Sequence, residues 1–112
     1  MVLKRNYNLY ACGRNSSGQL GDGTFEKPKR GMAKVLSQGE VVKAACGKSH
    51  SMALSRDGQV FSWGNNEHCQ LGIGRTDPQA IPVLAFADEI VDIDCGECFS
   101  MCLARDGCLY SW

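Results

Sequence analysis

The fold is decided by a segment of eighteen residues that the chain contains twice. The first copy reads Val41-Val-Lys-Ala-Ala-Cys-Gly-Lys-Ser-His-Ser-Met-Ala-Leu-Ser-Arg-Asp-Gly58. The second copy reads Ile90-Val-Asp-Ile-Asp-Cys-Gly-Glu-Cys-Phe-Ser-Met-Cys-Leu-Ala-Arg-Asp-Gly107 and is identical at nine of the eighteen positions. The copies lie 49 residues apart in a chain of 112, so the repeat determines the architecture.

A second match extends the repeat in both directions. Residues 9–21 align with residues 60–72 at an offset of 51, and Ser62-Trp63 recurs as Ser111-Trp112. A period of about 50 residues is typical of propellers and solenoids. We divide the chain into an N-terminal lead (1–8), a first repeat (9–58), a second repeat (60–107) and the start of a third (108–112).

Each repeat has the pattern of β-strands. In residues 42–46 and 91–95, every second residue is apolar: Val42, Ala44 and Cys46 in the first copy, and Val91, Ile93 and Cys95 in the second. This period of two is typical of a β-strand. Arg56-Asp-Gly58 and Arg105-Asp-Gly107 each separate two further strand-like runs, so each predicts a tight hairpin turn in which glycine supplies a positive φ. No segment has an apolar stripe of helical spacing. The sequence therefore predicts an all-β chain of small antiparallel sheets.

The order of these motifs resembles the repeat of the regulator-of-chromosome-condensation family. The motifs are Cys46–Leu54, Asp57-Gly58, Val60–Gly64 and Gln70–Gly72, and the resemblance extends from residue 9 to residue 112. It implies a β-propeller, commonly of seven blades, in which each blade is a four-stranded antiparallel sheet. The chain holds about two blades, so we expect part of a larger propeller, or of an assembly that completes one.

The repeated positions have structural roles in this scheme. We expect the two Cys-Gly pairs to end the crowded innermost strands, the tryptophans to be buried against a neighbouring blade, and the leucines of the Gln-Leu-Gly motifs to insert into blade edges. The predicted structural residues are Gly13, Leu20, Cys46, Gly47, Gly58, Trp63, Gly64, Leu71, Cys95, Gly96, Gly107 and Trp112.

The charges are balanced overall but not along the chain. Twelve basic residues match twelve acidic ones, which excludes a uniformly basic nucleic-acid wrapper. Residues 1–56 hold ten basic and three acidic residues, whereas residues 57–112 hold two and nine. This division predicts two complementary faces; the alternative is that both are solvated loops. The candidate partner-binding residues are Lys27, Lys29, Arg30, Lys34, Asp88, Glu89, Asp92 and Asp94.

Opposite charges also stand at aligned positions of the two repeats, Lys43 and Asp92. Exposed blade edges together with this charge pattern predict that the chain associates with further repeats, with a protein partner or with a second copy. The sequence predicts that salt weakens this association.

The chain has seven cysteines, and because seven is an odd number they cannot all form disulfides within the chain. Without a signal peptide, free thiols in a reducing compartment are expected, either cytoplasm or nucleus. Cys95, Cys98, Cys102, Cys108 and His68 suggest a zinc or redox site as an alternative. The repeat argues against it, because Ser49 and Ala53 stand where the second copy has Cys98 and Cys102. We expect no metal and no cofactor.

No catalytic constellation is readable. His50 has Phe99 as its counterpart, which indicates packing, and the glycine-rich residues 18–23 lack the Lys-Ser/Thr ending of a phosphate-binding loop. We therefore predict a non-catalytic module for protein interaction or structure. One alternative is a part of a guanine-nucleotide exchange factor for a Ran-type small GTPase, which the resemblance suggests; another is the cysteine site. A membrane role is not expected, and nucleic acid is a disfavoured partner.

Overall fold

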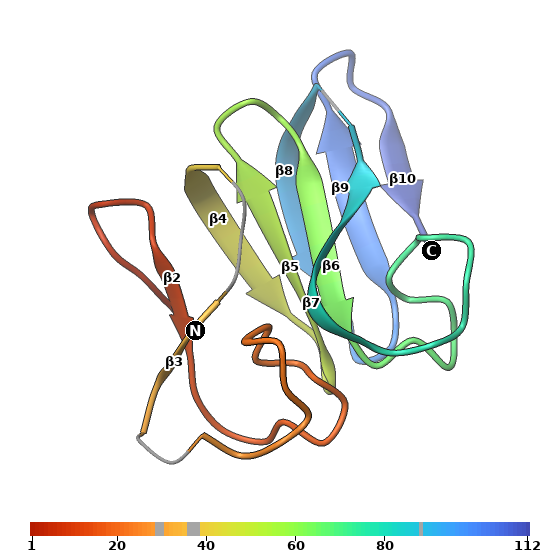
Figure 1. The fold of residues 1–112 in the computed structure, drawn as a ribbon. Helices are drawn as coiled ribbons and strands as arrows, with labels where there is room; N and C mark the ends of the chain where they lie inside the picture. Colours follow the sequence, from red (N-terminus) through yellow and green to blue (C-terminus); the bar gives the residue numbers. More distant parts are fainter. Residues whose placement is uncertain (29–30, 36–38, 88) are drawn as a thin grey trace.

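The computed structural model describes residues 1–28, 31–35, 39–87 and 89–112. It arranges ten described strands in three antiparallel sheets that stack side by side as blades (Figure 1). Blade 1 contains β1 (Val2–Leu3), β2 (Leu9–Ala11) and β3 (Ala33–Lys34); blade 2 contains β4 (Val41–Cys46), β5 (His50–Ser55), β6 (Val60–Gly64) and β7 (Gln79–Phe86); blade 3 contains β8 (Ile90–Cys95), β9 (Ser100–Ala104) and β10 (Leu109–Ser111). The all-β prediction is confirmed. Within these ranges no helix is long and apolar enough to cross a membrane.

Hairpin turns connect the strands where the sequence predicts them. Gly58 has φ 80° and donates its amide to the Ser55 carbonyl at 3.1 Å. Gly107 has φ 91° and donates to the Ala104 carbonyl at 3.0 Å. An L-residue rarely adopts such a φ, which is why glycine follows Asp in both turns. The two Arg-Asp-Gly turns therefore fix the same register in blades 2 and 3.

Blade 1 contains a hairpin that the sequence analysis did not predict. Residues 1–3 align with Met52–Leu54 at the offset of 51, and β1 pairs with β2 as β5 pairs with β6. Tyr7 occupies the glycine position of this turn with φ 64° and donates its amide to the Lys4 carbonyl at 2.9 Å. Its ring lies under the Arg56 guanidinium, 4.5 Å from the ring centroid, so the strained residue contacts the next blade.

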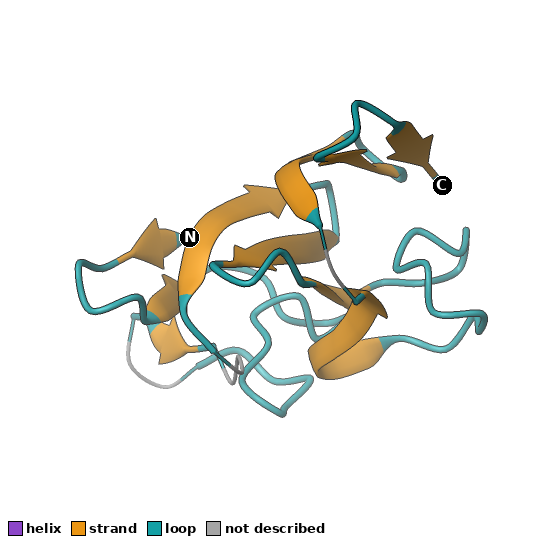
Figure 2. Cartoon of the chain, turned by 90° about the horizontal axis from the view of Figure 1, so that it is seen from above, coloured by secondary structure: helices purple, strands orange, loops and turns teal. Residues whose placement is uncertain are grey.

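The blades lie side by side in both views of the chain (Figures 1 and 2), and the core lies between them. One apolar cluster joins blades 1 and 2, and a second joins blades 2 and 3. Successive residues of β5 face opposite clusters: Ala53 belongs to the first, and Met52 and Leu54 to the second. All six residues of β5 are buried, because blade 2 is covered on both faces.

Candidate functional site

Neighbouring blades are joined by a repeated set of hydrogen bonds that we call the Trp lock. In the first lock the Gln19 carbonyl accepts from Trp63 Nε1 at 2.9 Å and from Ser51 Oγ at 2.9 Å. In the second lock, the Gln70 carbonyl accepts from Trp112 Nε1 at 3.0 Å and from Ser100 Oγ at 2.6 Å. Each lock thus joins the loop of one blade to a serine on the second strand of the next blade and to a tryptophan in or directly after its third strand.

The glycine of each Gln-Leu-Gly motif makes room for the indole. A Cβ on Gly21 would lie 2.7 Å from Trp63 Nε1, and a Cβ on Gly72 would lie 2.6 Å from Trp112 Nε1. The preceding Leu20 and Leu71 are buried. The sequence predicts these motifs as loop anchors, and the contacts show what they anchor.

Two buried asparagines shape the loops that carry the locks. Asn15 donates through Nδ2 to the carbonyls of Thr24 at 3.0 Å and Glu26 at 2.7 Å, and its Oδ1 accepts the Leu20 amide at 3.0 Å. Asn66 holds the corresponding loop of blade 2 through the carbonyls of Arg75 and Asp77 and the Leu71 amide. The sequence analysis noted the loop repeat without giving the asparagines a role; their recurrence was the available signal.

The inner strands of blades 2 and 3 converge at their Cys-Gly ends. A Cβ on Gly47 would lie 2.6 Å from the Gly96 carbonyl and 2.2 Å from the His50 ring, so only glycine fits there. Desolvation raises the pKa of Cys46, although part of its side chain is exposed at the surface, and raises that of the half-buried Cys95 to about 12. Both thiols therefore stay protonated and weakly nucleophilic. Throughout the described ranges, no three His, Cys, Asp or Glu side chains gather as metal ligands do.

His50 is the buried polar link between blades 2 and 3. Its Nε2 lies 3.0 Å from Ser100 Oγ, and Nδ1 is buried without a hydrogen-bond partner among the residues that the structure describes. Burial lowers the pKa of His50, so the neutral ring is the folded form.

This burial predicts a pH dependence of stability. The unfolded chain protonates His50 near its ordinary pKa, while the folded chain resists protonation, so the free energy of unfolding falls as pH drops from about 7 to about 5. Urea unfolding across this range, compared with His50→Gln, checks it. We expect the variant to lose part of the slope; an identical slope in both proteins would show that His50 does not titrate as described.

The predicted partner-binding residues lie on two separate blades. Lys27, in the β2–β3 loop, and Lys34, on β3, are exposed on blade 1. Glu89 precedes β8 on blade 3 and is exposed, as are Asp92 and Asp94 on that strand. Lys29, Arg30 and Asp88 lie outside the described residues. Among the members that the structure describes, the basic residues lie on blade 1 and the acidic ones on blade 3, and they are not brought together.

Asp92 has a partner within the chain. It forms an ion pair with Lys43 of β4, and this contact lowers the pKa of the Asp92 carboxyl. Five residues along, Lys48 and Glu97 form an equivalent pair at 3.3 Å. The expectation that Lys43 and Asp92 drive association between chains is therefore corrected: the propeller places equivalent inner-strand residues of successive blades side by side.

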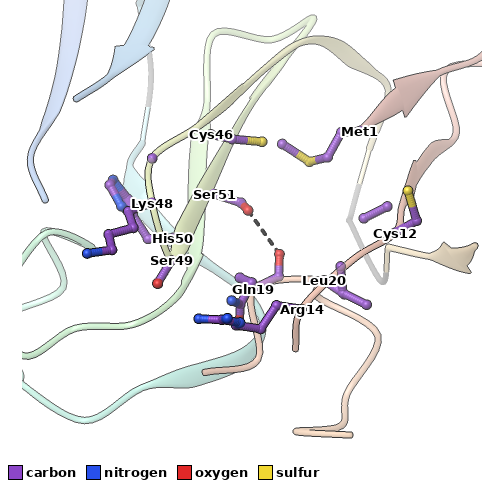
Figure 3. A pocket seen from close by; sticks show the side chains of 12 residues that line it. Met1, Cys12, Arg14, Gln19, Leu20, Cys46, Lys48, Ser49, His50 and Ser51 are labelled. Carbon is purple, nitrogen blue, oxygen red and sulfur yellow. Dashed lines mark hydrogen bonds between the residues drawn. The ribbon is translucent and has the colours of Figure 1, made fainter. Parts of the chain in front are cut away.

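Two grooves of opposite charge lie between the blades, at the end of the strands where the Trp locks are. Groove A, between blades 1 and 2, is lined by Arg14, Gln19, Lys48 and Ser49 among others (Figure 3). Groove B, between blades 2 and 3, is lined by Lys48, Ser49, Asn65, Glu67, His68, Gln70, Glu97 and Cys98. Sequence reasoning missed Arg14 and Lys48 as site residues because only blade packing brings them together.

One face of blade 3 is open. Leu109 is 62% exposed, whereas Val60, which occupies the same position in blade 2 and faces blade 3, is 0% exposed. The adjacent Tyr110 points to the other face of the blade, where its ring lies 5.2 Å from that of Phe86 in blade 2. Phe99, the counterpart of buried His50, is 50% exposed. Leu109 and Phe99 have the character of core residues, but no described segment covers them.

Comparisons with known proteins agree with this architecture. The model of the regulator of chromosome condensation (RCC1) repeat matches residues 8–54 and 57–103, and a second model of that repeat matches residues 41–70. The chain is 47% identical over 79 residues to the human probable E3 ubiquitin-protein ligase HERC6, covering 66% of this chain and 8% of that protein. It is 40% identical over 86 residues to mouse protein RCC2, covering 73% of this chain and 16% of that protein.

Solved structures show the same fold. Human WBSCR16 superposes with a TM-score of 0.79 at 26% identity, covering 92% of this chain and 28% of that one. Yeast RCC1 (Prp20), solved with Kap60 bound, superposes with a TM-score of 0.83 at 22% identity, covering 98% and 29%. The chain thus spans under a third of these structures. The repeat matches, the propeller blades and their locks together show that the chain belongs to the RCC1 repeat family.

Proposed function

We propose that this chain is a non-catalytic module of a propeller whose role is to bind protein, and that the open face of blade 3 is covered in use by further repeats or a protein partner. The observation that carries the proposal is the contrast between Leu109 and Val60, which share a position in the repeat but differ from 62% to 0% in exposure. Burying apolar surface of this kind against another segment or protein is favourable, so an exposed apolar face marks an interaction site.

The ligase name of a longer relative belongs to that protein, and we do not assign its activity to this chain. The chain matches 8% of HERC6, so that protein's ligase name describes much more chain than is present here. In the described ranges, the buried histidine serves blade packing and the inner-strand thiols are held protonated. These observations favour binding over catalysis. We place the chain in the cytoplasm or nucleus, as the free cysteines predict.

A matched pair of variants tests the proposal. Leu109→Ser should change the free energy of unfolding by less than about 0.5 kcal/mol, since the side chain is exposed in the single chain. Val60→Ser, at the same repeat position, should cost about 2–4 kcal/mol because it leaves a cavity and a buried hydroxyl. In sedimentation velocity, Leu109→Ser should also reduce association of the isolated chain. Equal stability losses, or unchanged association, would contradict an open binding face.

The exchange-factor alternative has its own assay. Prp20p, a yeast neighbour in fold, is described by its binding to Gsp1p and histones, and that description concerns a chain over three times as long. A Ran-type GTPase loaded with a fluorescent GDP analogue should release it at the intrinsic rate when this chain is added. Accelerated release would contradict the interaction module and support the exchange factor.

The cysteine alternative is tested by measuring the zinc content of the purified chain. We expect no bound zinc.

A further inference from the structure

The two grooves carry opposite charges although they occupy equivalent places in the repeat. Groove A has Arg14 and Lys48 where groove B has Asn65 and Glu97, at offsets of 51 and 49. Glu67 also lines groove B, whereas no carboxylate is among the described residues that line groove A. The repeat therefore builds one backbone frame twice. Lys48 lines both grooves, Arg14 adds a second cation to groove A, and Glu67 and Glu97 give groove B an excess of negative charge.

Arg14 is the cation best placed to bind a ligand in groove A. Its side chain is exposed, and no described carboxylate pairs with it. Figure 3 shows it beside Gln19, with Ser49 and Lys48 on the neighbouring segment of blade 2. A guanidinium presents a planar fork of donors that matches a carboxylate or phosphate in two parallel hydrogen bonds.

Lys48 adds a second charge that is free to move. Its pair with Glu97 spans 3.3 Å, and both side chains are roughly 70% exposed, at 68% and 71%. An exposed pair of this kind contributes little, so Lys48 can turn from Glu97 towards an anion in groove A at small cost.

We propose that groove A binds an acidic side chain, a carboxylate or a phosphorylated residue, on a protein partner, with Arg14 as the principal contact. The inference rests on the proposed interaction function and names the chemistry of the partner. A protein can place a negative group over groove A and a neutral or positive group over groove B. A nucleic acid running along the same edge would bring phosphates against Glu67 and Glu97, so its repeating charge fits less well.

Fluorescence anisotropy with three labelled probes tests the inference: an octaglutamate peptide, the same length of phosphoserine-containing peptide, and a twelve-nucleotide oligothymidylate, all at about 0.05 M salt. We expect the full chain to bind at least one of the peptides. Arg14→Asn, which installs the groove B residue, should weaken that binding about fivefold, equivalent to about 1 kcal/mol.

Arg105→Asn is the matched control, because it removes the same charge at the β9–β10 turn, at the opposite end of the strands from the grooves. It should change peptide affinity less than twofold, within the effect expected of a distant exposed charge. Thermal melts confirm that both variants fold. Equal weakening by the two substitutions, absence of peptide binding, or oligothymidylate binding that depends on Arg14 more than peptide binding does would each overturn the proposal. Because the open face of blade 3 is tested separately by Leu109→Ser, failure here leaves that result unchanged.

Discussion

Replacing Trp63 by alanine should lower the free energy of unfolding by about 3–5 kcal/mol. The side chain is 0% exposed and packs in the cluster that joins blades 1 and 2. Its removal also takes away the Nε1 donor to the Gln19 carbonyl, which then accepts from the Ser51 hydroxyl alone. Reversible urea unfolding followed by circular dichroism measures the loss.

Trp112→Ala is the natural control for this prediction. Trp112 makes the same bond to the Gln70 carbonyl at 3.0 Å and stacks on Phe86, but it is only partly buried in the open blade. Its removal should cost less than that of Trp63, about 1–2 kcal/mol. A loss below about 1 kcal/mol for Trp63→Ala would show that the indole does not hold blades 1 and 2 together.

Gly58→Val should destabilise the chain by about 2–4 kcal/mol. Two effects add at this position. A β-branched side chain resists the φ of 80°, and a Cβ would stand 2.9 Å from the Glu89 amide nitrogen of the next blade. The turn also forms a hydrogen bond with blade 3, because the Ile90 amide donates to the Gly58 carbonyl at 3.1 Å. Urea unfolding again gives the difference.

Gly107→Val separates the two effects. Gly107 has the same turn and a φ of 91°, but nothing lies within 4 Å of a Cβ built there. It should show the backbone strain alone, about 1–2 kcal/mol. If both variants lose the same stability, the contact between Gly58 and blade 3 contributes nothing, and the described packing of the two blades is wrong.

The sequence could predict what depends on local chemistry. The turns at Gly58 and Gly107, the buried Trp63 and the anchoring leucines follow from residue type and recurrence. The hairpin of residues 1–8 could not be recognised in the same way, because Tyr7 stands where the other two turns have glycine. A tyrosine with positive φ gives no turn signal, and its contact with Arg56 exists only after the blades pack.

The charged sites could not be predicted, because the neighbours of each charged residue are set by the packing of the blades. Arg14 and Lys48 are far apart in the chain, and each looks like an ordinary surface cation until blades 1 and 2 bring both to one groove. Asp92 was predicted to meet a partner, but Lys43 pairs with it within the chain. An offset of 49 identifies equivalent positions, and only the propeller arrangement makes equivalent positions neighbours.

Sedimentation velocity of the unmodified chain tests most directly the central claim, that the face of blade 3 requires cover. The isolated chain, lacking a partner, should cover Leu109 and Phe99 with a second copy, so its weight-average sedimentation coefficient should rise with protein concentration. Because this face is apolar and Lys43 and Asp92 pair within the chain, the rise should persist from about 0.05 to about 0.5 M salt, contrary to the expectation from sequence. A folded monomer at every concentration and salt would contradict the account.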